Sequence, residues 1–349
     1  MSRVAVTGAA GPVGRRLVDL LLVDASVDAV VAIDRDDPVS SHLDHDRVEV
    51  HRVQLRGADL EPILRDVDTV CHLAGSDPLE DRAPDHDLRT TARVLDAARR
   101  AGVAQVLVRS SATVYGAWPD NPIPLPETAP TRPNNESEWV RVRMEIEESV
   151  VAFGGDEPDV TVAILRPCVT VSGAGPDELG RVLAAARLMS ASDDAPAAQF
   201  VHADDVAAAF DVVRRSAAGG VFNVAPDGAL TADLIRALVG GAPRIPLPDG
   251  VARRLTTLGW RYQIAPTPPG FVPFVRHPWV VGNDKLRALG WTPSHTNEEA
   301  FVVGHAAAPW AQVSPQRRQE IALGLAGAVI VGGIAGIGAL VRRRLGARS

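Results

Sequence analysis

The stretch VAVTGAAGPVGRRL, residues 4–17, joins an apolar run to a helical pattern through a turn that contains three glycines. Gly8, Gly11 and Gly14 are spaced TGxxGxxG rather than the more common GxGxxG. At a turn from a strand into a helix, glycines let backbone N–H groups approach a pyrophosphate group. The stretch therefore predicts a strand–turn–helix unit with a dinucleotide site, in which we include Pro12 and Val13.

Short apolar runs rich in β-branched residues continue to alternate with helical patterns after this turn. Alternation of this kind is typical of βαβ units and a parallel sheet. We predict a doubly wound α/β fold of the Rossmann kind over residues 1–165, and a smaller C-terminal lobe, interleaved with returning strands of the core, over residues 166–300. Strands are expected within AVVAIDRDD (29–37), VEVHRVQL (48–55), DTVCHLAG (68–75), QVLVRSSATVYG (105–116) and TVAILRPCVTVSG (161–173).

The charge and the cysteine content exclude several classes of protein. A formal net charge of −7 argues against a nucleic-acid surface, because phosphate binding needs a basic patch. The two cysteines, Cys71 and Cys168, lie far apart, which excludes a disulfide framework and a zinc site built from paired cysteines. We expect no metal site and no nucleic-acid partner.

Asp34 stands at the end of the second predicted strand, 20 residues after Gly14. A carboxylate at this position can accept hydrogen bonds from both hydroxyls of the adenosine ribose and would repel a 2′-phosphate. NAD is therefore expected as the cofactor rather than NADP. The neighbouring Arg35, which we include in the cofactor site, weakens this inference.

With these motifs in order, the chain resembles the extended short-chain dehydrogenases/reductases, the NAD-dependent epimerase/dehydratase family. The resemblance covers residues 3 to about 300 and implies cofactor contacts at Leu73, Ala74, Gly75, Ser110 and Pro167. An Asp-Leu pair of the family is replaced by Gln54 and Leu55, where the amide oxygen can still accept a hydrogen bond from adenine. The matching motifs are CHLAG (71–75), SSATVYG (110–116), LRP (165–167), FVHADDVAAAF (200–210), FNVA (222–225) and NDKLRALGWTP (283–293).

The resemblance also implies a catalytic site with hydride transfer to or from the nicotinamide, and here the chain departs from the pattern. Ser111 matches the serine that contacts the substrate oxygen, whereas Trp139 and Arg143 stand where the family has its tyrosine and lysine. An indole can donate a hydrogen bond but cannot act as an acid or base near neutral pH. Arg143 can still contact the nicotinamide ribose with its planar, charged guanidinium.

Other groups could take over the missing proton transfer. Tyr115, Glu136 and Glu138 are candidates, although each is expected to be structural or solvated. Cys168 stands near the family's substrate-contacting asparagine and could be a reactive thiol or, as we favour, a small apolar residue at a strand end.

Residues 321–341, IALGLAGAVIVGGIAGIGALV, carry no charge. A helix of this length spans about 30 Å, the thickness of a bilayer's hydrocarbon core. We predict a transmembrane helix there, after a linker over 301–320 and before a basic tail over 342–349. The globular domain is expected to be cytoplasmic, although arginines on both sides leave the orientation open. Small residues recur every four positions along one side of this helix: Gly324, Ala328, Gly332 and Gly336. A second helix could approach closely there, so a homodimer through this helix is an option.

The sequence favours two functions over a third, a scaffold that no longer binds NAD, because the third would make the glycine turn and Asp34 relics. The first is a membrane-anchored, NAD-binding oxidoreductase of the epimerase/dehydratase type with atypical or impaired catalysis and an unknown small-molecule substrate, which the predicted anchor suggests is lipid-like. The second is a non-enzymatic sensor or scaffold at the membrane that responds to NAD.

Overall fold

A seven-stranded parallel sheet forms the centre of the chain. The computed structural model describes residues 2–36, 45–75, 85–134, 137–189, 195–238 and 269–305. The strands lie in the order β10-β6-β5-β4-β1-β2-β3. Their bounds are β1 Ser2–Thr7, β2 Val27–Asp34, β3 Val48–Arg52, β4 Thr69–His72, β5 Gln105–Arg109, β6 Thr161–Pro167 and β10 Gly220–Val224.

The strand order reverses beside β1, which pairs with β2 on one side and with β4 on the other. The chain runs outward through β2 and β3, and then returns to build β4, β5 and β6 on the opposite side. Ligands of open parallel sheets bind at such a switch point, outside the carboxyl ends of the strands. The topology therefore places a candidate site at the ends of β1, β2, β4 and β5.

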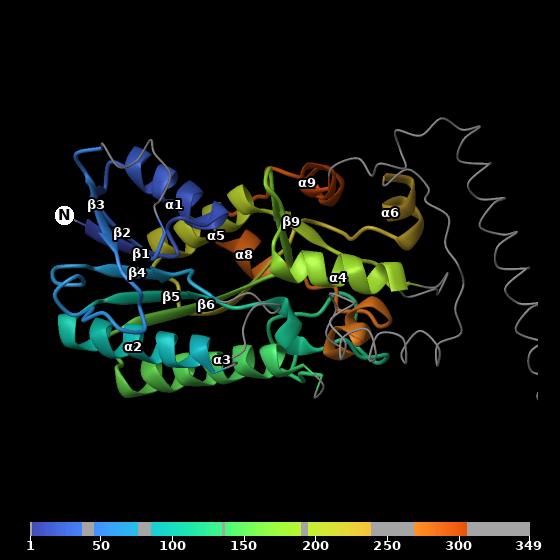
Figure 1. Cartoon of the computed structure of the whole chain (residues 1–349), viewed down its shortest axis with the longest axis horizontal. Coiled ribbons are helices and arrows are strands. Elements are labelled where there is room, and N and C mark those ends of the chain that lie inside the picture. Colours follow the sequence, from blue (N-terminus) through green and yellow to red (C-terminus); the bar gives the residue numbers. More distant parts are fainter. Residues whose placement is uncertain are drawn as a thin grey trace, which may run out of the picture. The chain divides into compact units, whose positions relative to one another are not determined.

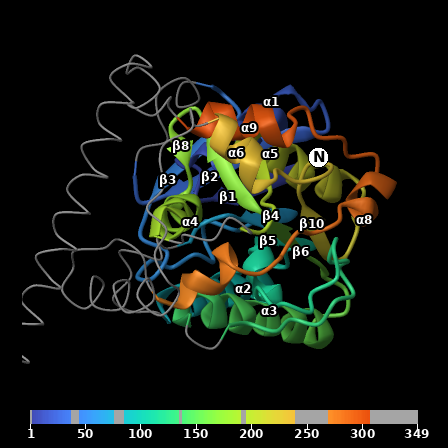
Figure 2. The same ribbon diagram turned by 90° about the vertical axis from the view of Figure 1, so that its right-hand side faces the viewer.

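Helices cover both faces of the sheet (Figure 1). Helices α1 (Pro12–Val23) and α5 (Ala203–Arg215) pack together on one face, and α2 (His86–Ala101) and α3 (Glu138–Asp156) pack together on the other. Figure 2 shows the same layers from the end of the sheet. Val70, Val106 and Ile164 of the strands and Val94 and Ile146 of the two helices are buried in one apolar cluster. The predicted doubly wound sheet is confirmed.

A small lobe adjoins the carboxyl end of β6. Its three-stranded sheet has the order β8-β7-β9, with β7 at Val169–Ser172, β8 at Gly175–Pro176 and β9 at Phe200–His202. Helices α4 (Glu178–Met189) and α9 (Asn297–Gly304) contact this sheet, and α9 begins at a capping box formed by Thr296 and Glu299. The predicted smaller lobe is thus present, and β10 returns from it to the main sheet.

Short elements complete the described chain. The 3-10 helices are η1 at Ala112–Tyr115 and η2 at Pro269–Val275, and α8 spans Asp284–Ala288. Helix α6 (Ala232–Leu238) lies almost wholly in a second compact unit, whereas the elements above belong to the first. The predicted domain boundary at residue 165 stays a prediction.

Within the part of the chain that the structure describes, no helix is long and apolar enough to cross a membrane. The predicted transmembrane segment 321–341 and the basic tail 342–349 lie outside the described residues. The predicted linker begins inside α9, which continues to Gly304.

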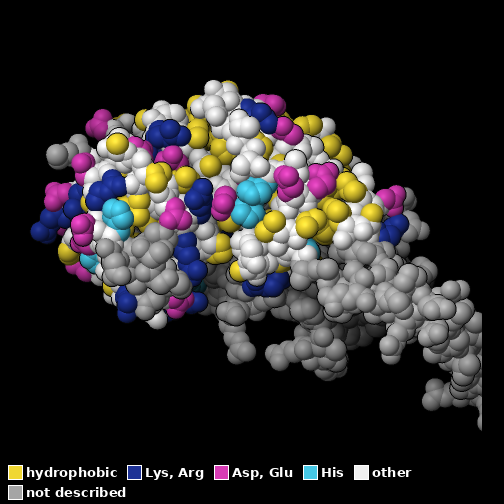
Figure 3. All heavy atoms as spheres, turned by 90° about the horizontal axis from the view of Figure 1, so that it is seen from above, with side chains coloured by type: hydrophobic (Ala, Val, Ile, Leu, Met, Phe, Trp, Pro, Cys, Tyr) yellow, Lys and Arg dark blue, Asp and Glu magenta, His cyan; other side chains and the backbone are white. Residues whose placement is uncertain are grey.

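On the face shown in Figure 3, acidic and basic side chains are interspersed instead of forming a patch of one sign.

Candidate dinucleotide site

The turn between β1 and α1 needs glycine for steric reasons. Gly8 has a φ of +73°, and a Cβ atom there would lie 2.8 Å from the backbone nitrogen of Ala74, after β4. A Cβ atom on Gly14 would lie 2.1 Å from the carbonyl oxygen of Gly8. Gly11 donates its N–H to that same carbonyl at 3.1 Å. The three glycines thus let the turn, α1 and the β4 loop approach one another closely.

The N-terminus of α1 suits an anion. Gly11 is its N-cap and supplies no side-chain cap, and Pro12 at the first helical position has no N–H. The remaining N–H groups of the first turn have no partner within the helix, and the helix dipole adds partial positive charge there. Val13 and Gly14 are buried in this first turn. These features fit the pyrophosphate of a dinucleotide.

Asp34 ends β2 with its carboxylate beside the glycine turn. One oxygen accepts a hydrogen bond from the N–H of Ala10 at 2.9 Å, and the other accepts from the N–H of Asp36 at 3.2 Å. An ionised carboxylate has about four lone-pair sites, so capacity remains for two ribose hydroxyls. The side chain of Arg35 is 71% exposed and pairs with Asp36.

Gln54 and Leu55 lie just beyond the carboxyl end of β3. Gln54 is exposed, and its backbone carbonyl oxygen accepts hydrogen bonds from the N–H groups of Gly57 and Ala58. Leu55 is half-buried against the core cluster. The exposed amide of Gln54 is thus positioned at the β2–β3 side of the switch point, while Leu55 serves packing.

The end of β4 is tied to the end of β1 through Thr7. The N–H of Leu73 donates to the carbonyl of Thr7 at 3.1 Å, and that of Ala74 donates to the Thr7 hydroxyl at 3.4 Å. His72 joins the Thr7 hydroxyl at 2.7 Å and the Thr91 hydroxyl of α2 at 3.1 Å. Burial lowers the pKa of His72 to about 4, so this imidazole is neutral. Sequence reasoning missed the roles of Thr7 and Thr91.

The two serines after β5 differ in their hydrogen bonding. The Ser111 hydroxyl caps η1, because it accepts from the N–H of Thr113 at 3.3 Å and from the Thr113 hydroxyl at 3.0 Å. Ser110 is 5% exposed, and its hydroxyl has no hydrogen-bond partner among the described residues. A buried polar atom without a hydrogen-bond partner lowers the stability of the folded protein. A ligand at this edge could supply the partner, and the site therefore fits a cofactor.

Arg143 and Trp139 lie one turn apart on α3, whose N-cap is Ser137. Arg143 is 8% exposed, and its Nη2 donates to Oδ2 of Asp87 on α2 at 2.6 Å. Its Cζ lies 4.8 Å from the centre of the Trp139 ring. A Cβ atom on Gly75 would lie only 2.9 Å from Nη2 of Arg143. The structure therefore brings Gly75, Trp139 and Arg143 together, with Asp87, which sequence reasoning missed.

Trp139 also contacts η2 of the later chain. Its ring centre lies 6.0 Å from that of Phe271, which is buried and packs in turn against Phe274. The indole N–H of Trp139 has no acceptor among the described residues. This aromatic contact between η2 and α3 was not predicted from the sequence.

The two described candidates for a substitute acid–base group, Tyr115 and Glu138, are held by other partners. Tyr115 is buried, and its hydroxyl donates to Oδ1 of Asn223 at 2.8 Å. Burial raises its pKa, although the nearby Arg166 partly opposes this. Glu138 is exposed and pairs with Arg141, and Glu136 lies outside the described residues.

Pro167 and Cys168 lie where β6 ends. Cys168 is 2% exposed, and burial raises the pKa of its thiol well above the ordinary range. A thiol that stays protonated is a poor nucleophile. This environment favours the packing role for Cys168.

Comparison with known proteins places the chain in a family. Residues 4–225 match the family described as "NAD dependent epimerase/dehydratase family". The uncharacterized protein Rv0501 of Mycobacterium tuberculosis is 27% identical over 323 residues, covering 85% of this chain and 82% of that protein.

Two solved structures have the same fold. The UDP-glucose 4-epimerase of Thermus thermophilus in complex with NAD is 22% identical with a TM-score of 0.63, covering 89% of this chain and 99% of that one. The UDP-glucuronic acid 4-epimerase of Bacillus cereus in complex with UDP-glucuronic acid and NAD is 17% identical with a TM-score of 0.65, at the same coverage. From the family match over residues 4–225, together with the glycine turn and the strand order, the chain belongs to the NAD-dependent epimerase/dehydratase family.

Proposed function

We propose that this protein binds NAD at the carboxyl edge of its main sheet and carries out the family's oxidoreductase chemistry only in an impaired or atypical form. The observation that carries the proposal is the placement of Asp34 beside the glycine turn, with its carboxylate bonded to the N–H of Ala10. A negative charge there favours a ribose diol over a 2′-phosphate. The solved relatives named above are complexes with NAD, which supports the same cofactor.

The arrangement of the site suggests how the dinucleotide lies. The first turn of α1 would hold the pyrophosphate, and Asp34 would hold the adenosine ribose on the side of β2. The nicotinamide half must then lie on the other side of the switch point, over the ends of β4 and β5. Gly75, Ser110 and Arg143 are the groups at that end. When bound, NAD would supply a hydride acceptor there.

The impaired chemistry follows from positions 139 and 143, which by resemblance replace the family's tyrosine and lysine. Trp139 can orient a carbonyl oxygen through its indole N–H but cannot transfer a proton. A guanidinium is not deprotonated in proteins, so Arg143 cannot act as an acid or base. Loss of a positioned general acid–base typically costs about 10² to 10⁴ in rate. The hydroxyl of Ser111 keeps a proton to donate and could still contact a substrate oxygen.

Two observations suggest two different classes of substrate. The solved relatives are named as acting on UDP-sugars, so a sugar nucleotide is the first candidate. The uncharged segment 321–341 supports a membrane anchor, and with it a lipid-linked or amphiphilic substrate met at the membrane surface.

A second function, an NAD-responsive sensor or scaffold, is favoured by one further observation. Arg143, Trp139 and Asp87 form a packed group that keeps charge and shape without a proton donor that titrates near neutral pH. Such a site could bind the dinucleotide and transmit its presence to a partner.

Calorimetric titration of the full chain with NAD and with NADP tests the proposal. We expect NAD to bind at least about tenfold more tightly than NADP, a difference of about 1.4 kcal/mol. Stronger binding of NADP would contradict the role given to Asp34. Absence of binding by either dinucleotide would refute both functions.

A further inference from the structure

The ion pair between Asp87 and Arg143 is buried at the nicotinamide end of the proposed site. Their side chains are 6% and 10% exposed, and the two join helices α2 and α3 across 56 residues of sequence. His86 lies nearby, with Nδ1 3.5 Å from Oδ1 of Asp87. The buried carboxylate therefore sits where it can oppose the charge of the arginine.

The guanidinium of Arg143 is held on three sides. Asp87 accepts its hydrogen bond, the Trp139 ring lies across one face, and a Cβ atom on Gly75 would lie 2.9 Å from its Nη2. A guanidinium fixed in this way cannot swing toward or away from a ligand as a lysine ammonium can. The guanidinium and the carboxylate that accepts its hydrogen bond therefore keep fixed positions in the site.

We infer that Asp87 sets the preference of the site between the oxidised and the reduced dinucleotide, by offsetting the charge of Arg143 beside the nicotinamide ring. This inference rests on the proposed function, because it requires the nicotinamide half to lie near Gly75. The nicotinamide ring is a cation in NAD and neutral in NADH. An uncompensated arginine would repel only the oxidised form, whereas the pair repels it much less.

The size of the effect follows from Coulomb's law in a partly buried site. At an effective dielectric constant of about 20, the interaction between two unit charges roughly 8 Å apart is large enough to change a binding constant by about tenfold or more. The adenosine, pyrophosphate and ribose groups are common to both forms. Their contacts therefore cancel when the dissociation constants of NAD and NADH are compared as a ratio.

Three variants of the full chain test the inference, with NAD binding followed by calorimetry and NADH binding by its fluorescence. Asp87→Asn removes one negative charge from the pair, so the ratio Kd(NAD)/Kd(NADH) is expected to rise roughly tenfold. Arg143→Gln removes one positive charge, so the ratio is expected to fall. The double variant Asp87→Asn/Arg143→Gln restores zero net charge, and its ratio is expected to return to within about threefold of the unaltered protein. All titrations are run at pH 8, where histidine side chains are ordinarily uncharged.

The outcomes separate electrostatics from packing and from the proposed function. Equal changes in both dissociation constants, with the ratio unmoved, would show that Asp87 is only structural and would overturn the inference while leaving NAD binding intact. A ratio that moves in the same direction in both single variants would also overturn it. If Asp87→Asn does not fold, the inference is tested by Arg143→Gln alone, for which the ratio Kd(NAD)/Kd(NADH) is expected to fall. If the unaltered chain binds neither form, the proposed function fails, and this inference fails with it.

Discussion

The carboxylate of Asp34 accepts a hydrogen bond from the backbone N–H of Ala10 at 2.9 Å, so the end of β2 is bonded directly to the glycine turn that follows β1. The same carboxylate is the proposed partner of the adenosine ribose. One side chain thus supports the turn that is proposed to hold the pyrophosphate, and the same side chain is proposed to select the sugar beside it.

Replacement of Asp34 should therefore weaken NAD binding and relax the discrimination against NADP. For Asp34→Ala we expect the Kd for NAD to rise by at least about tenfold, because charge-assisted hydrogen bonds contribute about 1.5–3 kcal/mol. The Kd for NADP should change less, since the repulsion of its 2′-phosphate is lost too. Asp36→Ala is the matched control, as its side chain is 70% exposed. Equal losses for both dinucleotides in Asp34→Ala would contradict the prediction.

A methyl group at Gly14 should disrupt the turn. In Gly14→Ala the new Cβ would overlap the carbonyl oxygen of Gly8, and we expect a loss of at least about 2 kcal/mol in the free energy of unfolding, with loss of NAD binding. Gly57→Ala is the control, because apart from its chain neighbours no atom of the described residues lies within 4 Å of its added Cβ. Urea denaturation measures both variants. A Gly14→Ala protein as stable as the control would show that the turn tolerates a side chain.

Restoring the family's residue types should raise catalysis if the chain descends from an enzyme. We expect Trp139→Tyr/Arg143→Lys to increase the rate of hydride transfer to bound NAD from a UDP-sugar, followed at the absorbance of NADH. The gain expected for a positioned acid–base group is about 10² to 10⁴. Arg143→Lys alone supplies no proton donor in place of Trp139 and serves as the control. No gain in the double variant would favour the sensor over the oxidoreductase.

Tyr115 should prove structural. Tyr115→Phe leaves Oδ1 of the buried Asn223 without its donor, and we expect the free energy of unfolding to fall by about 1–3 kcal/mol. NAD affinity and any measurable turnover should stay within about twofold, because this hydroxyl is already bonded inside the core. A large loss of turnover with unchanged stability would instead identify Tyr115 as the acid–base group.

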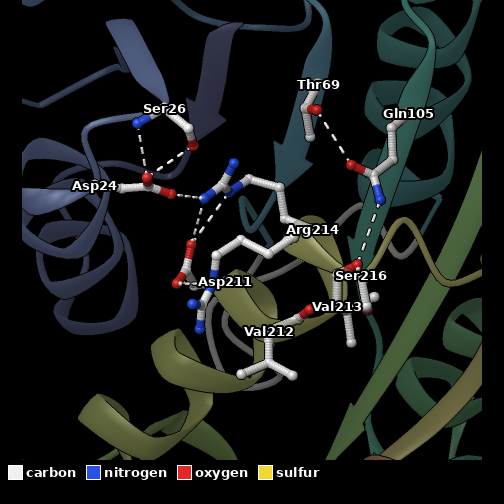
Figure 4. A network of polar contacts seen from close by, with 10 residues as sticks. Asp24, Ser26, Thr69, Gln105, Asp211, Val212, Val213, Arg214 and Ser216 are labelled. Atoms are coloured by element: carbon white, nitrogen blue, oxygen red, sulfur yellow. Dashed lines mark hydrogen bonds and ion pairs between the residues drawn. The ribbon is translucent and has the colours of Figure 1, made fainter. Parts of the chain in front are cut away.

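Asp24 should make stability depend on acid pH. Hydrogen bonds from the side chain and backbone of Ser26, together with Arg214, lower its pKa from 3.8 to about 2 (Figure 4). Because the pKa is lower in the folded protein, Asp24 stabilises the fold above about pH 4, and this contribution is lost as the pH falls toward 2. Arg214 is buried and also pairs with Asp211, linking α5 to the end of α1.

The measurement is urea denaturation of the unaltered protein and Asp24→Asn from pH 7 to pH 3. We expect a difference of roughly 1–2 kcal/mol at pH 7 that shrinks below about pH 4. Glu148→Gln, at an exposed position of α3, should change stability by less than about 0.5 kcal/mol throughout. A difference for Asp24→Asn that stays constant down to pH 3 would contradict the prediction.

The sequence by itself determined the doubly wound sheet and the placement of the glycine turn. Both depend on local rules: the period of apolar residues distinguishes strands from helices, and a turn such as that at Gly8 requires a residue that tolerates a positive φ. Asp34 could be anticipated for the same reason, because the end of one strand in a βαβ unit lies beside the turn of its neighbour.

Only the tertiary structure decided how the other end of the site is built. Asp87 and Arg143 are 56 residues apart, and Tyr115 and Asn223 are 108 apart, yet each pair is bonded in the interior. No local period encodes such contacts, because they depend on strand order and on which helix faces pack together. The sequence could therefore identify Arg143 as an unusual residue, but only the packing of α3 against α2 showed that Asp87 opposes its charge.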